Sequence, residues 1–168
     1  RSVAIERLAI IEGAPGSGKT TTLLPIIGAY RQAGYRVIGS ASAWNIVKML
    51  QADLKIEARA TRSWIAKIRL GHKVLDDRTV LILDEAGLVS AREMHAVLSA
   101  VERAGAKLVL VGDRDQLQAV GAGPGLALAG RAVESARVET IVRQRDGWVR
   151  DAIRAFGEGR AQAALQAF

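Results

Sequence analysis

A glycine-rich segment near the start of the sequence has the residue types and the spacing that bind phosphate groups. Its glycines let the backbone bend so that successive N–H groups point toward phosphate oxygens. Lys19 supplies a positive charge for the β- and γ-phosphates, and the Thr20 hydroxyl supplies a ligand for Mg²⁺. The sequence therefore predicts a phosphate-binding loop (P-loop) for a nucleoside triphosphate with Mg²⁺, formed by Gly13, Ala14, Pro15, Gly16, Ser17, Gly18, Lys19, Thr20 and Thr21.

Two adjacent carboxylates, Asp84 and Glu85, follow a continuous apolar run over residues 79–83. Such a run is typical of a strand buried on both faces of a sheet, and ligands bind beyond the carboxyl ends of such strands. Asp84 is suited to hold the hydration shell of Mg²⁺ beside the P-loop, and Glu85 to orient or deprotonate an attacking water. A kinase acting on a substrate hydroxyl would not need the second carboxylate, so the pair favours hydrolysis. The alternative interpretation is that Glu85 only caps a turn.

A third polar group follows the next apolar run, over residues 107–113. Gln116 is an uncharged donor and acceptor that can contact both the γ-phosphate and the attacking water. It would thereby report the state of the nucleotide to the surface beyond. By itself the segment also fits an ordinary turn formed by Asp113, and it gains weight beside the P-loop and the carboxylate pair.

Alternating strand-length and helix-length segments predict how these groups are positioned. The alternation is typical of βαβ units and of an α/β fold. We predict a parallel sheet with helices on both faces, formed by one domain over residues 1–168. The expected strands cover residues 4–11, 35–40, 79–83, 107–113 and 138–142, and the expected helices cover 19–32, 43–51, 61–69, 90–104 and 146–168, with a break at 157–159.

Particular residues mark the expected ends of these helices. Ser90 and Glu93 have the spacing of a capping box at a helix start, and Gly105 is placed to end the same helix. Gly34 stops the helix that follows the P-loop. Thr61 or its neighbour is expected to cap the short helix over residues 61–69.

The composition is that of a globular domain from the cytoplasm. Hydrophobic residues make up 49% of the chain and charged residues 24%, and no apolar run reaches the roughly 18 residues of a membrane span. There is no cysteine, which excludes disulfides and thiolate metal sites. The net charge of +7 fits a polyanionic partner such as nucleic acid, although a basic surface also serves solubility.

Four motifs occur in the order in which superfamily 1 helicases have them: GAPGSGKT, LILDEAG, LVLVGDRDQL and IVRQR. The chain resembles the RecD-like branch, and within it the helicase region of TraA/TrwC-type (MobF) conjugative relaxases. The segments GYRVIGSASA, ATRSWI and RQRDGWVRDAIRAFGEGRAQAAL agree as well, so the resemblance covers nearly the whole chain. It implies a RecA-like P-loop NTPase domain, the first motor domain (1A), with ATP held between it and a second RecA-like domain.

The resemblance also implies roles for individual residues. Arg143 matches the motif IV arginine that contacts the γ-phosphate, where a guanidinium stabilises charge in the transition state. Arg145 stands close enough to leave the choice open, and a solvated basic face is the alternative for both. A tryptophan on the DNA track can stack on a base, but burial is favoured for Trp64 and Trp148, and Trp44 is undecided. The segments that match motifs Ia and Ib imply a track for single-stranded DNA lined by Ser40, Ser42, Ala43, Trp44, Thr61, Ser63 and Trp64.

Several parts of the family pattern have no match in this sequence, namely the upstream glutamine that contacts adenine, the second motor domain and the relaxase's nuclease domain. We therefore expect a piece of a larger 5′–3′ DNA helicase, a monomer when isolated, that binds ATP weakly and hydrolyses it poorly. Its expected partners are single-stranded DNA, the second motor domain and the relaxase region. One alternative is a P-loop kinase for a small molecule, which the Asp84-Glu85 pair and the segment GDRDQL disfavour. The other is a nucleotide-dependent interaction module without turnover, which the intact Lys19, Thr20, Asp84, Glu85 and Gln116 disfavour.

Overall fold

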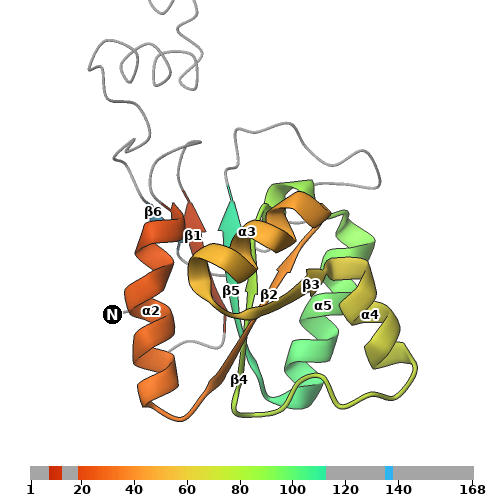
Figure 1. Cartoon of the computed structure of the whole chain (residues 1–168). Helices are drawn as coiled ribbons and strands as arrows, with labels where there is room; N and C mark the ends of the chain where they lie inside the picture. Colours follow the sequence, from red (N-terminus) through yellow and green to blue (C-terminus); the bar gives the residue numbers. More distant parts are fainter. Residues whose placement is uncertain (1–7, 13–18, 113–134, 138–168) are drawn as a thin grey trace, which may run out of the picture.

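The computed structural model describes residues 8–12, 19–112 and 135–137, and the structural statements below concern these residues (Figure 1). They form one sheet of six parallel strands in the order β3-β2-β4-β5-β1-β6, which confirms the predicted parallel sheet. The strands are β1 (Leu8–Glu12), β2 (Arg36–Ala41), β3 (Glu57–Ala60), β4 (Thr79–Leu83), β5 (Lys107–Gly112) and β6 (Ser135–Arg137).

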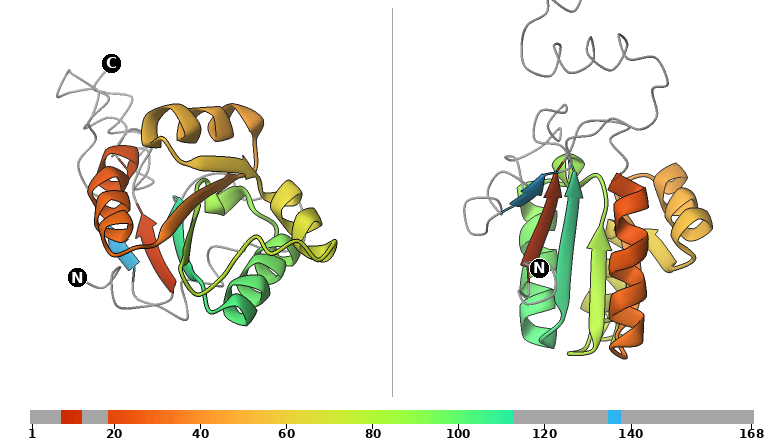
Figure 2. Two further views of the ribbon diagram at one scale, coloured as in Figure 1. Left: turned by 60° about the horizontal axis from the view of Figure 1, so that its bottom comes forward. Right: turned by 90° about the vertical axis from the view of Figure 1, so that its left-hand side faces the viewer.

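Helices cover both faces of the sheet, as predicted (Figure 2). Helices α2 (Lys19–Gln32) and α3 (Trp44–Leu54) pack on one face. Helices α4 (Thr61–Arg69) and α5 (Ala91–Ala104) pack on the other face. The result is a three-layer α/β arrangement, in which the sheet is shielded from water on both sides.

The central strand β4 shows why the sequence folds in this way. All five of its residues are buried. Val80 and Ile82 pack into the cluster beneath α2 and α3, whereas Leu81 and Leu83 pack into the cluster beneath α4 and α5. Successive side chains of a strand point to opposite faces, so a continuous apolar run can fill both cores at once. Each such side chain contributes about 1.5–3 kcal/mol on burial. This energy holds the apolar run in the sheet, so the polar residues that follow it mark the end of the strand.

The predicted helix ends are largely confirmed. Ser90 Oγ accepts the N–H of Glu93 at 3.4 Å and Glu93 Oε2 accepts the N–H of Ser90 at 3.3 Å, which completes the capping box of α5. Gly105 ends that helix with a φ of +67°, and Gly34 follows the end of α2 with a φ of +80°. Both glycines lie in the left-handed region that other residues adopt only at a cost.

The segment after β2 differs most from the prediction. Helix α3 continues past residue 51 to Leu54, and the sequence did not indicate strand β3 at all. The four residues of β3 include no β-branched side chain, and the strand pairs only with β2, at the edge of the sheet. Helix α4 has the predicted bounds, and of the two predicted N-cap positions, Thr61 or its neighbour, the neighbour Ala60 occupies the N-cap and makes no side-chain bond there.

Some predicted elements lie outside the described residues. These are the strand over residues 138–142 and the helix over residues 146–168, together with the first part of the strand over residues 4–11. Within the described part of the chain, no helix has the length and apolar character that crossing a bilayer requires.

Candidate functional site

The carboxyl edge of the sheet brings the predicted site segments together, because all strands run in the same direction. Strand β1 leads into the P-loop, β4 leads into Asp84, β2 leads into Ser42 and β3 leads into Thr61. In the sheet, β4 lies between β2 and β5, and β1 lies beyond β5. The carboxylate pair therefore stands between the segment predicted to bind nucleotide and the segments predicted to bind DNA.

Part of the predicted nucleotide site lies outside the described residues. This holds for the loop over residues 13–18, for Gln116 and for Arg143. Lys19, Thr20 and Thr21 open helix α2, but their side chains are not among those described. The roles of all these residues remain predictions from the sequence.

Asp84 is held in position from two sides. Its N–H donates to the carbonyl oxygen of Ser40 on β2 at 2.8 Å. Its Oδ1 accepts the N–H of Glu85 at 2.8 Å, and the residue is half-buried. A carboxylate has about four acceptor sites, so this bond is compatible with a further contact to a hydrated cation. Carboxylate oxygens are of the kind that Mg²⁺ prefers in nucleotide sites, so Asp84 suits the role that the sequence predicts for it.

Glu85 adopts an unusual backbone conformation at this edge. Its φ of 49° and ψ of 42° place it in the left-handed region, directly before the short helix η1 (Ala86–Leu88). Glu85 occupies the N-cap of η1, and its carbonyl oxygen accepts the N–H of Leu88 at 2.9 Å, but its side chain makes no capping hydrogen bond there. A residue other than glycine in this region costs about 1–2 kcal/mol. Such strain concentrates at functional sites, and no feature of the sequence indicated it here.

Three residues predicted to contact DNA are buried, which corrects the prediction. Ser40 is 1% exposed, Thr61 is 2% exposed and Trp64 is 5% exposed. The Ser40 and Thr61 hydroxyls hydrogen-bond to each other at 2.9 Å, and Trp64 Nε1 donates to the carbonyl oxygen of Gly39 at 2.8 Å. Their polar atoms satisfy one another in the core, so these side chains do not form a DNA-binding surface. The burial favoured for Trp64 is confirmed.

The remaining candidates for the DNA track stay at the surface. Trp44 is 61% exposed at the start of α3, although a side chain of this size is ordinarily largely buried. Ser42 is exposed, and Ala43 and Ser63 are half-buried. These four residues lie where β2 and β3 lead into helices at the carboxyl edge.

Arg62 is a surface residue that the sequence reasoning missed. Its side chain is 88% exposed, and its Nε donates to Glu93 Oε1 at 2.7 Å. That hydrogen bond raises the pKa of Arg62. Burial of the Glu93 carboxylate acts to raise the pKa of Glu93, but the hydrogen bonds from Arg62 and Ser90 outweigh burial and lower this pKa. The ion pair orients the guanidinium, and among the described residues neither terminal nitrogen of Arg62 has a hydrogen-bond partner. The sequence alone does not distinguish Arg62 from the other arginines, because the partner that orients it, Glu93, lies 31 positions away.

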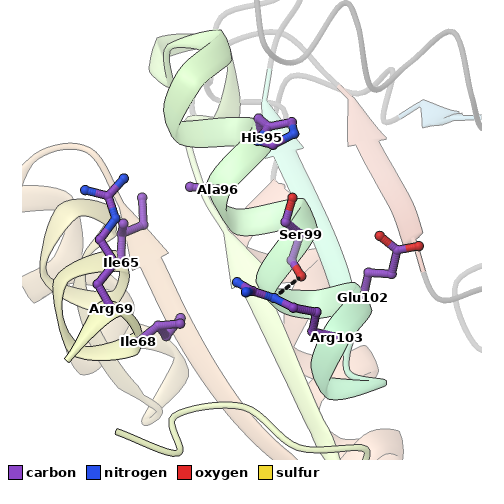
Figure 3. A pocket seen from close by; sticks show the side chains of 8 residues that line it. All are labelled: Ile65, Ile68, Arg69, His95, Ala96, Ser99, Glu102 and Arg103. Atoms are coloured by element: carbon purple, nitrogen blue, oxygen red, sulfur yellow. Dashed lines mark hydrogen bonds between the residues drawn. The ribbon is translucent and has the colours of Figure 1, made fainter. Parts of the chain in front are cut away.

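A separate groove of about 510 Å³ lies between α4 and α5 (Figure 3). Two isoleucines and Arg69 from α4 line one side, mostly polar side chains from α5 line the other, and Arg103 Nε donates to the carbonyl oxygen of Ser99 within α5. None of the predicted site residues lines this groove, whose walls are Ile65, Ile68, Arg69, His95, Ala96, Ser99, Glu102 and Arg103. It is therefore distinct from the carboxyl edge.

Comparison with known proteins places the whole arrangement in context. Residues 2–168 match a family model described as an AAA domain. Conjugal transfer protein TraA of Agrobacterium fabrum is 41% identical over 95% of this chain and 14% of its own length. The ATP-dependent RecD2 DNA helicase of Deinococcus radiodurans is 31% identical over 84% of this chain and 20% of its own length. The predicted resemblance to RecD-like helicases and to TraA-type relaxases is thus confirmed.

The fold is also shared with a solved helicase structure. The crystal structure of Pif1 helicase from Candida albicans superposes with a TM-score of 0.68 over 89% of this chain and 40% of that chain. The sequence identity is 20%, so this likeness concerns the fold alone. The chain spans only 14% of the length of the TraA relative.

Proposed function

We propose that this chain, which belongs to the AAA domain family, is the first ATP-hydrolysing motor domain of a conjugative DNA helicase. In this proposal ATP hydrolysis drives 5′–3′ movement along single-stranded DNA. The observation that supports it most strongly is the pair Asp84 and Glu85 at the end of the central strand, with Glu85 in a strained backbone conformation. A carboxylate kept at a cost of about 1–2 kcal/mol suggests a function that outweighs the strain.

The nucleotide side of the proposal assigns one task to each group. Lys19 neutralises the β- and γ-phosphates, while Thr20 and Asp84 hold Mg²⁺ of the bound ATP. Glu85 positions and deprotonates the attacking water. Two further groups contact the γ-phosphate, Gln116 and Arg143, and the loop over residues 13–18 supplies backbone N–H donors.

The DNA side of the proposal uses exposed and half-buried residues at the same edge. Ser42 and Ser63 donate hydroxyl hydrogen bonds to phosphate oxygens, and Arg62 supplies a charge that Glu93 already orients. Trp44 stacks on a base, which is worth about 1–3 kcal/mol and tolerates any sequence. The net charge of +7 favours the approach of a polyanion.

The partners follow from the same arrangement. A single motor domain provides one wall of an ATP site, so a second RecA-like domain completes it and supplies the remaining charge stabilisation. We propose that this second domain and a relaxase region belong to the same longer protein, as the names and lengths of the TraA relatives suggest. The isolated chain then binds ATP weakly and turns it over slowly.

An ATPase measurement on the full-length protein, with and without single-stranded DNA, tests the proposal. DNA should raise turnover, Lys19→Ala should abolish ATP binding, and Glu85→Gln should retain binding but reduce hydrolysis by about 100-fold or more. His95→Ala in the separate groove is the control and should behave as the wild type. Phosphate transfer to a small molecule with no response to DNA would indicate a kinase. Equal loss of ATP binding in the Lys19 and Glu85 variants would contradict the assigned roles.

A further inference from the structure

Side chains from helix α4 hold the carboxyl end of strand β2. Trp64 Nε1 donates to the carbonyl oxygen of Gly39 at 2.8 Å, and the hydroxyls of Thr61 and Ser40 lie 2.9 Å apart. On the opposite side of the same strand, the N–H of Asp84 donates to the carbonyl oxygen of Ser40 at 2.8 Å. Ser40 is therefore bonded to α4 through its side chain and to the carboxylate segment through its backbone.

The hydroxyl pair is committed to this connection. Ser40 and Thr61 are 1% and 2% exposed, so water does not replace either partner. Thr61 is the first residue of α4, but its hydroxyl bonds to β2 rather than capping its own helix. A buried hydroxyl without its partner costs about 1–3 kcal/mol, so the two residues stay together when either element is displaced.

The end of β2 is also too tightly packed to shift by itself. A Cβ atom added at Gly39 would lie 3.0 Å from Ala58 Cβ and 3.0 Å from Ile56 Cδ1. The neighbouring Ala41 is completely buried. In such dense packing a displacement of α4 is transmitted to β2 as a whole and is not absorbed by a void.

We propose that Ser40 and Thr61 are positioning residues that couple DNA bound at the start of α4 to Asp84. Arg62 and Ser63, the surface residues proposed to contact phosphate, directly follow Thr61 in the chain. The path from DNA to the nucleotide site then runs from these residues through the Thr61 and Ser40 hydroxyls to the backbone of Asp84. The inference rests on the proposed function, because it assumes that DNA stimulates ATP hydrolysis.

Paired measurements on the full-length protein test this coupling. The quantities are the maximal DNA stimulation of ATPase turnover and the dissociation constant for a labelled single-stranded oligonucleotide. Ser40→Ala and Thr61→Val should each lower the stimulation by about 2- to 30-fold, the range found for residues that couple two sites. Both side chains are buried, so the dissociation constant should change by less than about twofold. Thr61→Ser, which keeps the hydroxyl, should restore the stimulation.

The control is another buried threonine hydroxyl. Thr79 is 0% exposed and donates to Asp76 Oδ1 at the opposite end of β4. Thr79→Val should lower thermal stability about as much as Thr61→Val but leave the DNA stimulation intact. Unchanged stimulation in both the Ser40 and Thr61 variants, beside a stimulated wild type, would overturn the coupling alone. A wild-type protein that DNA does not stimulate would overturn the proposed function, and the coupling with it.

Discussion

The left-handed conformation of Glu85 leads to a prediction in which two variants at this position differ in stability although both lose ATP hydrolysis. Two non-glycine residues have positive φ among those described, Lys55 with 51° and Glu85 with 49°. Lys55 ends helix α3 at an exposed position, whereas Glu85 stands at the carboxyl edge. If the conformation is strained, replacement by glycine should relieve the strain at both positions.

The size of the effect follows from two opposing terms. A side chain in the left-handed region costs about 1–2 kcal/mol, while glycine loses about 0.5–1 kcal/mol more conformational entropy on folding. Glycine should therefore be more stable than alanine at this position by about 0.5–1 kcal/mol. For a domain of this length, such a difference raises the Tm by about 1–4 °C.

The comparison of Glu85→Gly with Glu85→Ala isolates the backbone, because both variants lose the same carboxylate and its contacts. Urea unfolding followed by circular dichroism gives the free energies. At Lys55 the glycine variant should likewise have the larger free energy of unfolding. Lys48 is a solvent-exposed residue in the middle of α3, and there the alanine variant should be the more stable one, because glycine in a helix is less favourable than alanine by about 1 kcal/mol. Equal stabilities for glycine and alanine at residue 85, with a clear difference at residue 55, would refute the strain. Both Glu85 variants should lose ATP hydrolysis.

Three further predictions concern the described contacts. Trp64→Phe keeps the ring in the core but leaves the carbonyl of Gly39 without its donor, so urea unfolding should show a loss of about 1–3 kcal/mol. Gly39→Ala forces a Cβ within 3.0 Å of two side chains, and the same measurement should show a loss of about 1–3 kcal/mol. The pKa of Glu93 is lowered from its ordinary 4.5, so its contribution is fully present above that pH and is lost as the pH falls through the lower folded value. Stability measured from pH 7 to pH 3 should therefore fall more steeply below about pH 4.5 in the wild type than in Glu93→Gln.

The elements that could be predicted from the sequence are those whose signal is local. The bounds predicted for the strand over residues 79–83 are those of β4, because four consecutive apolar residues after Thr79 are typical of a buried parallel strand. The start of α5 was predicted from Ser90 and Glu93, whose reciprocal bonds depend only on residues three positions apart. In both cases the signal that predicts the element lies within the segment itself.

The features that could not be predicted depend on contacts between distant residues. Ser40 and Thr61 are 21 positions apart, and each hydroxyl is buried only because the other satisfies it. From the sequence both residues resembled exposed phosphate ligands. Strand β3 is formed by pairing with β2 and has little β-propensity of its own. The sign of φ at Glu85 is likewise set by the exit of β4 into η1, since no glycine marks the turn.

The burial of Ser40, Thr61 and Trp64 changes which residues of motifs Ia and Ib are expected to contact DNA. In each motif a buried polar residue comes shortly before exposed ones: Ser40 precedes Ser42 and Trp44 by two and four positions, and Thr61 directly precedes Arg62. The buried residues hold the end of β2 and the start of α4 together, and this rigid support positions the exposed residues that are proposed to contact DNA. If this division holds, Arg62→Ala should weaken DNA binding and reduce its dependence on salt, because a phosphate contact is lost. Thr61→Val should leave both quantities unchanged. Titration of the full-length protein with a labelled oligonucleotide at several salt concentrations measures both, and a weaker salt dependence in Thr61→Val would contradict the division.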